Sequence, residues 1–145
     1  MITIIQRVTQ ASVSIEGNNV GKIEQGIMAL IAVEKNDTEK SVQRLLERIL
    51  NYRIFPDADD RMNLNLKVIQ GGLLLIPQFT LAADTNSGNR PSFTPAASPE
   101  QGQLLFNHLL SLAKQSYPAT QAGVFGADMQ VSLINDGPVT FTLTV

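Results

Sequence analysis

Short segments rich in β-branched residues fill the first 33 residues of the chain, and they constrain its fold more than any other feature. Residues 2–8, 12–15 and 20–23 are predicted strands, with Gly17-Asn18-Asn19 as the hairpin turn between the last two. Residues 27–33 follow as a continuous apolar run, which is typical of a buried strand. The chain therefore begins as a sheet.

Two amphipathic segments after this sheet are predicted helices. In residues 39–50 apolar side chains recur at helical spacing, and Thr38 stands where a helix N-cap is expected. Ser98-Pro99 places a second cap and a proline at the first helical position, so a helix is expected from there to about residue 114. The stretch 82–95 between them is rich in Asp, Asn, Ser, Gly and Pro, and loops of this length are often functional.

The remaining apolar segments are predicted strands. Gly71-Gly72 introduces one over residues 73–81, and two closing strands, 129–134 and 139–145, flank a Gly-Pro turn. This order predicts an α+β fold of mainly antiparallel sheets curled into a barrel-like core with two outer helices. The length and 43% hydrophobic content suit a single domain over residues 1–145.

Composition excludes several function classes. The chain lacks cysteine, and it has neither an apolar run long enough to cross a membrane nor a basic segment at its start, so a cytoplasmic protein is expected. A net charge of −2 argues against a broad nucleic-acid footprint, and we expect no DNA or membrane partner. Basic residues gather in one region, so any RNA contact should be local and salt-sensitive: Lys35, Lys40, Arg44, Arg48 and Arg53.

The inventory of reactive side chains is poor. His108 lies in an apolar helical segment and is interpreted as structural, which leaves no catalytic triad. The carboxylates of Asp57, Asp59 and Asp60 are interpreted as a polar turn, with a metal role as the alternative. A threonine such as Thr80 has no evident base beside it, and a hydroxyl without a base is a weak nucleophile. We expect no metal and no cofactor.

Two polar motifs embedded in apolar runs carry most of the functional information. The first is Gln78-Phe79-Thr80 after residues 73–76, and the second is Asn135-Asp136-Gly137-Pro138-Val139-Thr140. A strand that supplies N–H groups and a hydroxyl can hold a carbonyl and its developing oxyanion. A Gly-Pro pair presents bare carbonyls without side-chain reach, so it can reject a ligand by shape.

With these motifs the whole sequence resembles the D-aminoacyl-tRNA deacylase family. The first motif is similar to the family's SQFTxA and the second to its NxGPVT. The resemblance implies a homodimeric carboxylic ester hydrolase that acts on D-aminoacyl-tRNA and on glycyl-tRNA. It also implies that the 2′-hydroxyl of the terminal ribose assists the reaction. A cis Gly-Pro peptide of one subunit would exclude L side chains from the site of the other.

The same resemblance assigns the site residues. It places the catalytic groups at Gln78, Phe79 and Thr80, and the chirality filter at Gly137 and Pro138. We assign Arg7 to support of the Gly-Pro carbonyls, with a solvated arginine as the alternative. Met129 is expected to line the amino-acid pocket.

The chain departs from the family pattern at Pro77, where the family has serine. Proline offers neither a hydroxyl nor an N–H, so a step that needs either group at this position is lost or is taken over by water. Two hypotheses therefore remain. The chain is either an editing esterase or a noncatalytic dimeric RNA-binding or interaction module of the same fold.

Overall fold

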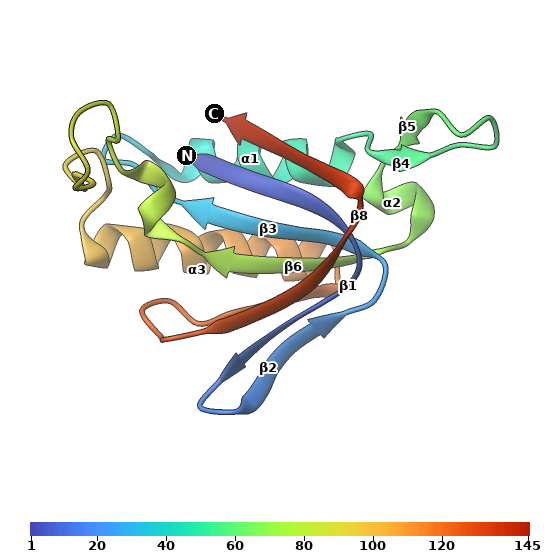
Figure 1. Cartoon of the computed structure of the whole chain (residues 1–145), viewed down its shortest axis with the longest axis horizontal. Coiled ribbons are helices and arrows are strands. Elements are labelled where there is room, and N and C mark those ends of the chain that lie inside the picture. The colour runs from blue at the N-terminus through green and yellow to red at the C-terminus, as the bar shows by residue number, and fades with distance from the viewer.

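The computed structural model describes residues 1–145 and has one curled sheet with two long helices behind it (Figure 1). Strand β1 (Ile2–Ile15) pairs antiparallel with β2 (Asn18–Ile23), β3 (Gly26–Ala32) and β8 (Gln130–Thr144). β1 is one continuous strand, so the prediction of two separate strands was wrong. The polar residues Thr9 and Gln10 that interrupt its apolar pattern are exposed, while its backbone ladder to β8 continues past them.

The turn between β1 and β2 lies earlier than predicted. Glu16 and Gly17 occupy it with φ values of +50° and +80°, and Asn18 already belongs to β2. Positive φ at both central residues defines the mirror-image turn that suits the right-handed twist of a hairpin. Glycine at the second of these positions therefore fixes where the chain reverses.

Two further strands close the sheet toward a barrel. β6 (Gly72–Pro77) lies parallel to β3, and β7 (Thr120–Ala122) lies parallel to β6. At the far edge β2 comes back toward β7, because a Cβ added to Gly21 would lie 3.1 Å from the Ala122 carbonyl oxygen. The predicted barrel-like, mainly antiparallel α+β fold is confirmed. A short ribbon of β4 (Phe55–Pro56) and β5 (Met62–Leu64) stands apart from it and was not predicted.

Both predicted helices are confirmed, as α1 (Glu39–Asn51) and α3 (Pro99–Ser116). The Ser98 hydroxyl accepts from the Gln101 N–H at 3.3 Å, as its capping role requires. Two single-turn elements were missed, α2 (Leu66–Ile69) and the 3₁₀ turn η1 (Phe79–Ala82). None of the helices is long and apolar enough to cross a membrane.

The core has two parts, one on each face of the sheet. The larger part lies between the sheet and the two long helices, and its largest fully buried side chains include Phe55, Phe106, Ile49, Leu45 and Leu73. The smaller part fills the inside of the curl between β1, β3 and β6, and it includes Val8, Met28 and Leu74. Burial on both faces explains why β3 and β6 read as continuous apolar runs.

Strand β6 ends at Pro77, so the predicted strand over residues 73–81 was too long. Proline has no N–H to give to a continuing ladder, and the chain turns into η1 two residues later. The first motif therefore opens a helical turn and does not lie in a strand.

The second motif forms a bulge in a single strand, and the prediction of two closing strands was wrong. Gln6 of β1 faces Thr140 and Val8 faces Asn135, so Arg7 alone stands opposite residues 136–139. We call these four residues the Gly-Pro bulge. β8 pairs with β1 on both sides of it, because an insertion of this kind interrupts a ladder without ending the strand.

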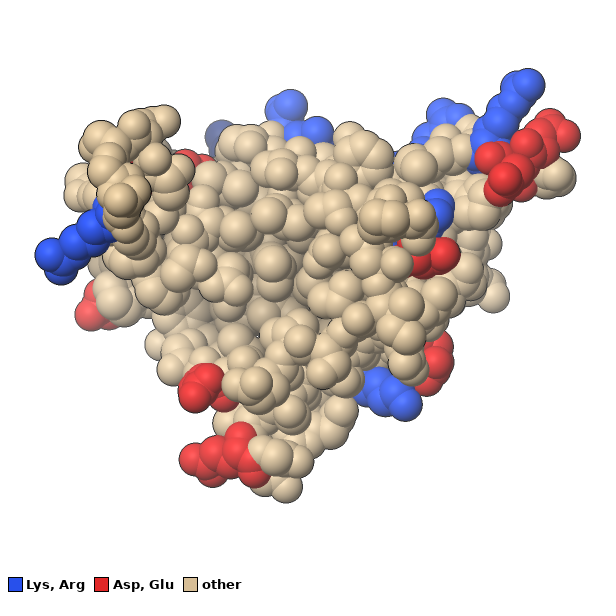
Figure 2. Space-filling view, in the orientation of Figure 1, with Lys and Arg blue, Asp and Glu red and all other residues tan.

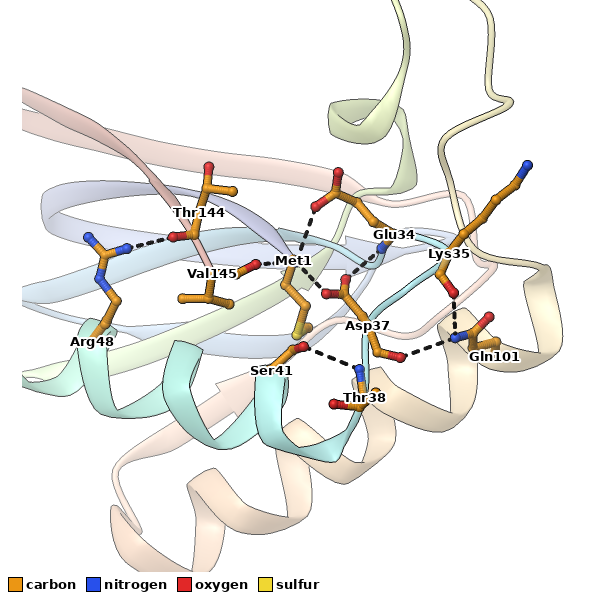
Figure 3. A network of polar contacts seen from close by, with 10 residues as sticks. All are labelled: Met1, Glu34, Lys35, Asp37, Thr38, Ser41, Arg48, Gln101, Thr144 and Val145. Carbon is orange, nitrogen blue, oxygen red and sulfur yellow. Dashed lines mark hydrogen bonds and ion pairs between the residues drawn. The ribbon is translucent and has the colours of Figure 1, made fainter.

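The two chain termini meet at the start of α1 in a buried polar network (Figure 3). The ammonium group of Met1 is fully buried and pairs with Asp37 Oδ1 at 2.6 Å and with Glu34 Oε2 at 3.1 Å. It also donates to the Val145 carbonyl at 3.1 Å, and Gln101 of α3 donates to the Asp37 carbonyl at 3.2 Å. The network thus joins β1, β8, α1 and α3 at one point.

Replacement of Asp37 should destabilise the fold strongly. Asp37→Ala leaves the buried ammonium without its inner partner, and loss of one partner of a buried pair typically costs about 3 kcal/mol. The free energy of unfolding is measured by urea denaturation at fixed protein concentration. Glu34→Gln, which removes the outer and partly exposed partner, should lose less than about 1 kcal/mol. Equal losses in the two variants would contradict this account.

Candidate active site

The first motif places a small set of hydrogen-bonding groups at the carboxyl end of β6. The Gln78 N–H donates to the Ile31 carbonyl at 2.7 Å, which ties the start of η1 to β3. The Gln78 side-chain amide donates to Thr80 Oγ1 at 2.6 Å. Phe79 and Thr80 begin the turn, and the first N–H groups of a helix have no partner within it. The backbone N–H groups left for a ligand are therefore those of Phe79 and Thr80, and that of Gln78 is already used.

Phe79 is unusually exposed for a large aromatic side chain. Its exposed fraction is 55%, and its ring centroid lies 5.1 Å from that of Phe93, which is 42% exposed. Phe93 belongs to the predicted long loop, which returns over η1 and is closed by two backbone hydrogen bonds between Asp84 and Ser92. The loop thus brings a second aromatic ring to the motif.

An apolar cavity of about 270 Å³ opens beside Phe79. β3 supplies one wall through Ile31 and Val33, and Pro77 borders it at the end of β6. The opposite wall comes from the start of α3 and from Phe125, whose ring lies 6.5 Å from that of Phe106. The site therefore combines free backbone donors with an apolar hollow.

Met129 lies near this cavity without lining it. A Cβ added to Gly123 would lie 2.6 Å from the Met129 sulfur and 3.5 Å from Cδ of Pro77. The thioether therefore sits over Gly123, next to the end of β6. Its proximity agrees with the expected pocket, while its place as a lining residue stays a prediction.

Arg7 and Asn135 hold the Gly-Pro bulge from two sides. Arg7 Nε donates to the Asp136 carbonyl at 3.0 Å, and Nη1 donates to the Ile54 carbonyl at 2.8 Å. The Asn135 side chain accepts from the Val139 N–H at 2.8 Å. The Gly137-Pro138 peptide is cis, as expected. Arg7 thus holds the bulge at Asp136. Its support of the Gly137 and Pro138 carbonyls stays a prediction.

Within one chain the first motif follows the end of β6, whereas the second motif, on β8, lies level with the start of β6. Arg7, opposite the bulge, pairs with Ile27, which pairs with Leu73 near the start of β6. Gln78 follows the last residue of the same strand, and five residues of strand span roughly 16 Å. The structure therefore brings Gln78, Phe79 and Thr80 together, and it separates them from Arg7, Gly137 and Pro138.

The structure contains no nucleophile with a base beside it. His108 is on α3 with its Nε2 buried and without a hydrogen-bond partner, and Thr140 Oγ1 accepts from the amides of Asn135 and Gln6. The Asp57 carboxylate accepts N–H groups inside its own turn, chiefly that of Arg61, and these lower its pKa. No group of three acidic, histidine or cysteine side chains stands where it could hold a metal.

Sequence reasoning missed the part of the cavity wall that α3 contributes. Gly102 lines the cavity, and a Cβ added there would lie 3.1 Å from the Phe125 ring. A glycine inside a helix is unfavourable by about 1 kcal/mol relative to alanine, so it often marks a close approach. That signal was present in the sequence. The pairing of Phe93 with Phe79 had none, because it depends on the path of a long loop.

Comparison with known proteins finds similarity to one protein family along almost the whole chain. The sequence profile of the family described as D-Tyr-tRNA(Tyr) deacylase matches residues 4–144. The D-aminoacyl-tRNA deacylase of Pseudoalteromonas atlantica is 55% identical over 145 residues, and the alignment covers 100% of both chains.

Solved structures show the same fold. One described as "c-Myc DNA Unwinding Element Binding Protein" superposes with a TM-score of 0.95 at 35% identity, covering 100% of this chain and 99% of that one. A probable eukaryotic D-amino acid tRNA deacylase superposes with a TM-score of 0.87 at 14% identity, covering 98% and 97%. The second likeness concerns the fold alone.

Proposed function

The chain belongs to the D-Tyr-tRNA(Tyr) deacylase family, and we propose that it hydrolyses the ester joining a D-amino acid to the 3′ end of tRNA. The observation that carries this proposal is the start of η1, where the N–H groups of Phe79 and Thr80 have no backbone partner and Phe79 lines the apolar cavity. An ester carbonyl bound there has donors for its oxygen and an apolar surface for the groups around it. The activity is an editing reaction that returns free D-amino acid and tRNA.

The N–H groups of Phe79 and Thr80 stabilise the oxyanion of the tetrahedral intermediate. They are fixed by the helical turn, and the turn is itself tied to β3 through Gln78. One donor of this kind is worth roughly 3 kcal/mol, or about a hundredfold in rate. Gln78 acts by positioning the turn and Thr80, and not through its own N–H.

The 2′-hydroxyl of the terminal ribose supplies the proton transfer that the protein does not. Thr80 Oγ1 accepts a hydrogen bond from the Gln78 amide, and an amide is not a base that takes a hydroxyl proton. The other candidate bases lie elsewhere in the fold. A ribose hydroxyl next to the scissile ester is already in place when the substrate binds.

The chirality filter comes from a second copy of the chain. The Gly-Pro bulge is too far from its own η1 to act there, but in a homodimer it reaches the η1 of the partner. The face of the sheet turned away from the helices is nearly free of charged side chains (Figure 2), and interface centres are depleted of charge. At the partner's site the bulge crowds an L side chain. Glycyl-tRNA passes the same filter because glycine has no side chain.

Pro77 favours a second candidate, a noncatalytic RNA-binding module. Its ring borders the cavity where the family has serine, and it gives neither a hydroxyl nor an N–H. The strand end nevertheless keeps its shape, because the Gln78 N–H still reaches Ile31. Measured turnover decides between the two candidates.

The purified protein should deacylate D-tyrosyl-tRNA and spare L-tyrosyl-tRNA. Rejection of the abundant L form requires about 10⁴-fold selectivity, which corresponds to about 5.5 kcal/mol. Deacylation rates of the two matched substrates measure it. Equal rates for the two substrates would contradict the chirality filter. If neither substrate is hydrolysed, the noncatalytic RNA-binding module is the remaining candidate. Pro77→Ser is the control that tells whether this position limits the rate.

Thr80→Ala should keep substantial activity, within about tenfold of the wild type, because the hydroxyl is not the nucleophile. A substrate that ends in 2′-deoxyadenosine should be nearly inert with both proteins. Single-turnover deacylation of the two substrates by the two proteins measures this. The reverse pattern, an inert variant and a reactive deoxy substrate, would restore Thr80 as the nucleophile.

Two inactive variants should complement each other in mixed dimers. Phe79→Pro removes an oxyanion donor, and Gly137→Ala distorts the bulge, since φ there is +133° and the added Cβ would lie 2.8 Å from Val139. A mixed dimer contains one site with both halves intact, so coexpression should restore about a quarter of wild-type activity. Deacylation by the coexpressed pair measures it. A site built within one chain would stay inactive in the mixture.

A further inference from the structure

The outer face of α1 carries a row of positive charges without carboxylate partners. Lys40, Arg44 and Arg48 are four residues apart, so they lie along one face of the helix and span about 12 Å. Lys40 and Arg44 are exposed, and Arg48 is half-buried and donates to the Thr144 carbonyl at 2.7 Å. The side-chain ion pairs of the chain are Arg7–Asp136 and Lys22–Glu24, so none involves this row. We call these three residues the α1 row.

Basic residues outnumber acidic ones around the α1 row, although the protein as a whole is acidic. Glu39 and Glu47 share the helix with it, while Lys35 precedes it and Arg53 and Lys67 follow. Figure 2 shows blue side chains along the edge of the molecule over α1, and red ones at the opposite tip near the β1–β2 hairpin. A net charge of −2 is thus distributed so that one edge attracts anions.

The turn that leads into α1 follows closely on a residue of the cavity wall. Val33 lines the cavity, and Lys35 follows two residues later at the turn into α1. Gln101 near the start of α3 donates to the Lys35 and Asp37 carbonyls at 3.2 Å, so this turn is fixed to the other cavity wall. From this turn the helix continues with Lys40 and then Arg44.

We infer that the α1 row binds the phosphate backbone of the duplex stem behind the aminoacylated 3′ end of the tRNA. This inference rests on the proposed function, and it adds the surface that receives the body of the substrate. Lysine and arginine side chains on phosphates position a nucleic acid without reading its sequence. Such a surface would hold the stem of a tRNA without regard to its base sequence.

Lys40→Gln with Arg44→Gln tests the row and leaves Arg48 and its backbone contact intact. The matched control is Lys22→Gln with Lys114→Gln, which changes net charge by the same amount at two exposed sites off α1. With D-tyrosyl-tRNA the row variant should raise KM roughly tenfold at low salt and leave kcat within twofold. Its plot of log kcat/KM against log salt should be shallower by about 1.4 to 1.8, as expected for two lost phosphate contacts.

A substrate without phosphates separates the outcomes. D-tyrosyl adenosine ester should be cleaved equally by the wild type, the row variant and the control. If the row variant and the control have the same KM and the same salt dependence with D-tyrosyl-tRNA, the inference is overturned and the proposed function still stands. Reduced cleavage of the adenosine ester by the row variant would also overturn it, because the defect would then lie in the site. If the wild type cleaves neither substrate, the proposed function fails. The inference then stands or falls on whether the row variant binds uncharged tRNA about tenfold more weakly than the control.

Discussion

The backbone ladder of β1 is the interaction on which the rest of the structure depends. One strand of 14 residues pairs with three others, and its two halves belong to different parts of the curl. Its first half lies between β3 and β8 and carries the side that packs on the helices. Its second half lies between β2 and β8 and turns the sheet toward closure. Both candidate functional motifs are positioned through this ladder, one opposite Arg7 and the other by way of β3.

The end of β6 shows how one backbone property places a reactive site. Pro77 ends the ladder, and the Gln78 N–H donates to the Ile31 carbonyl. The next two N–H groups have no backbone partner, and Phe79 lines an apolar cavity. Nothing in this arrangement requires a charged or strongly nucleophilic side chain. Chemistry that relies on fixed backbone dipoles and on a hydroxyl of the substrate suits a chain whose single histidine has a buried Nε2 without a hydrogen-bond partner.

Local signals explain what was predictable from the sequence. Both long helices were found because caps such as Ser98 and the 3.6-residue period lie within the segment itself. β1 and β8 were each predicted as two strands, because the continuity of each depends on a partner more than 100 residues away in the sequence. The motif residues were named from short patterns, but their separation follows from strand register, which depends on the pairing of β3 with β6. The motif residues could thus be identified from neighbouring residues alone, whereas the distance between the two motifs depends on long-range strand pairing.

The burial of the first nitrogen makes the fold sensitive to the chemistry of its own start. The Met1 ammonium is enclosed by Asp37, Glu34 and the Val145 carbonyl, and its side chain is fully buried. An acyl group on that nitrogen, whether formyl or acetyl, would remove its positive charge and leave Asp37 as a buried carboxylate without its cation. The charge on this one nitrogen therefore affects how firmly β1, β8, α1 and α3 are joined.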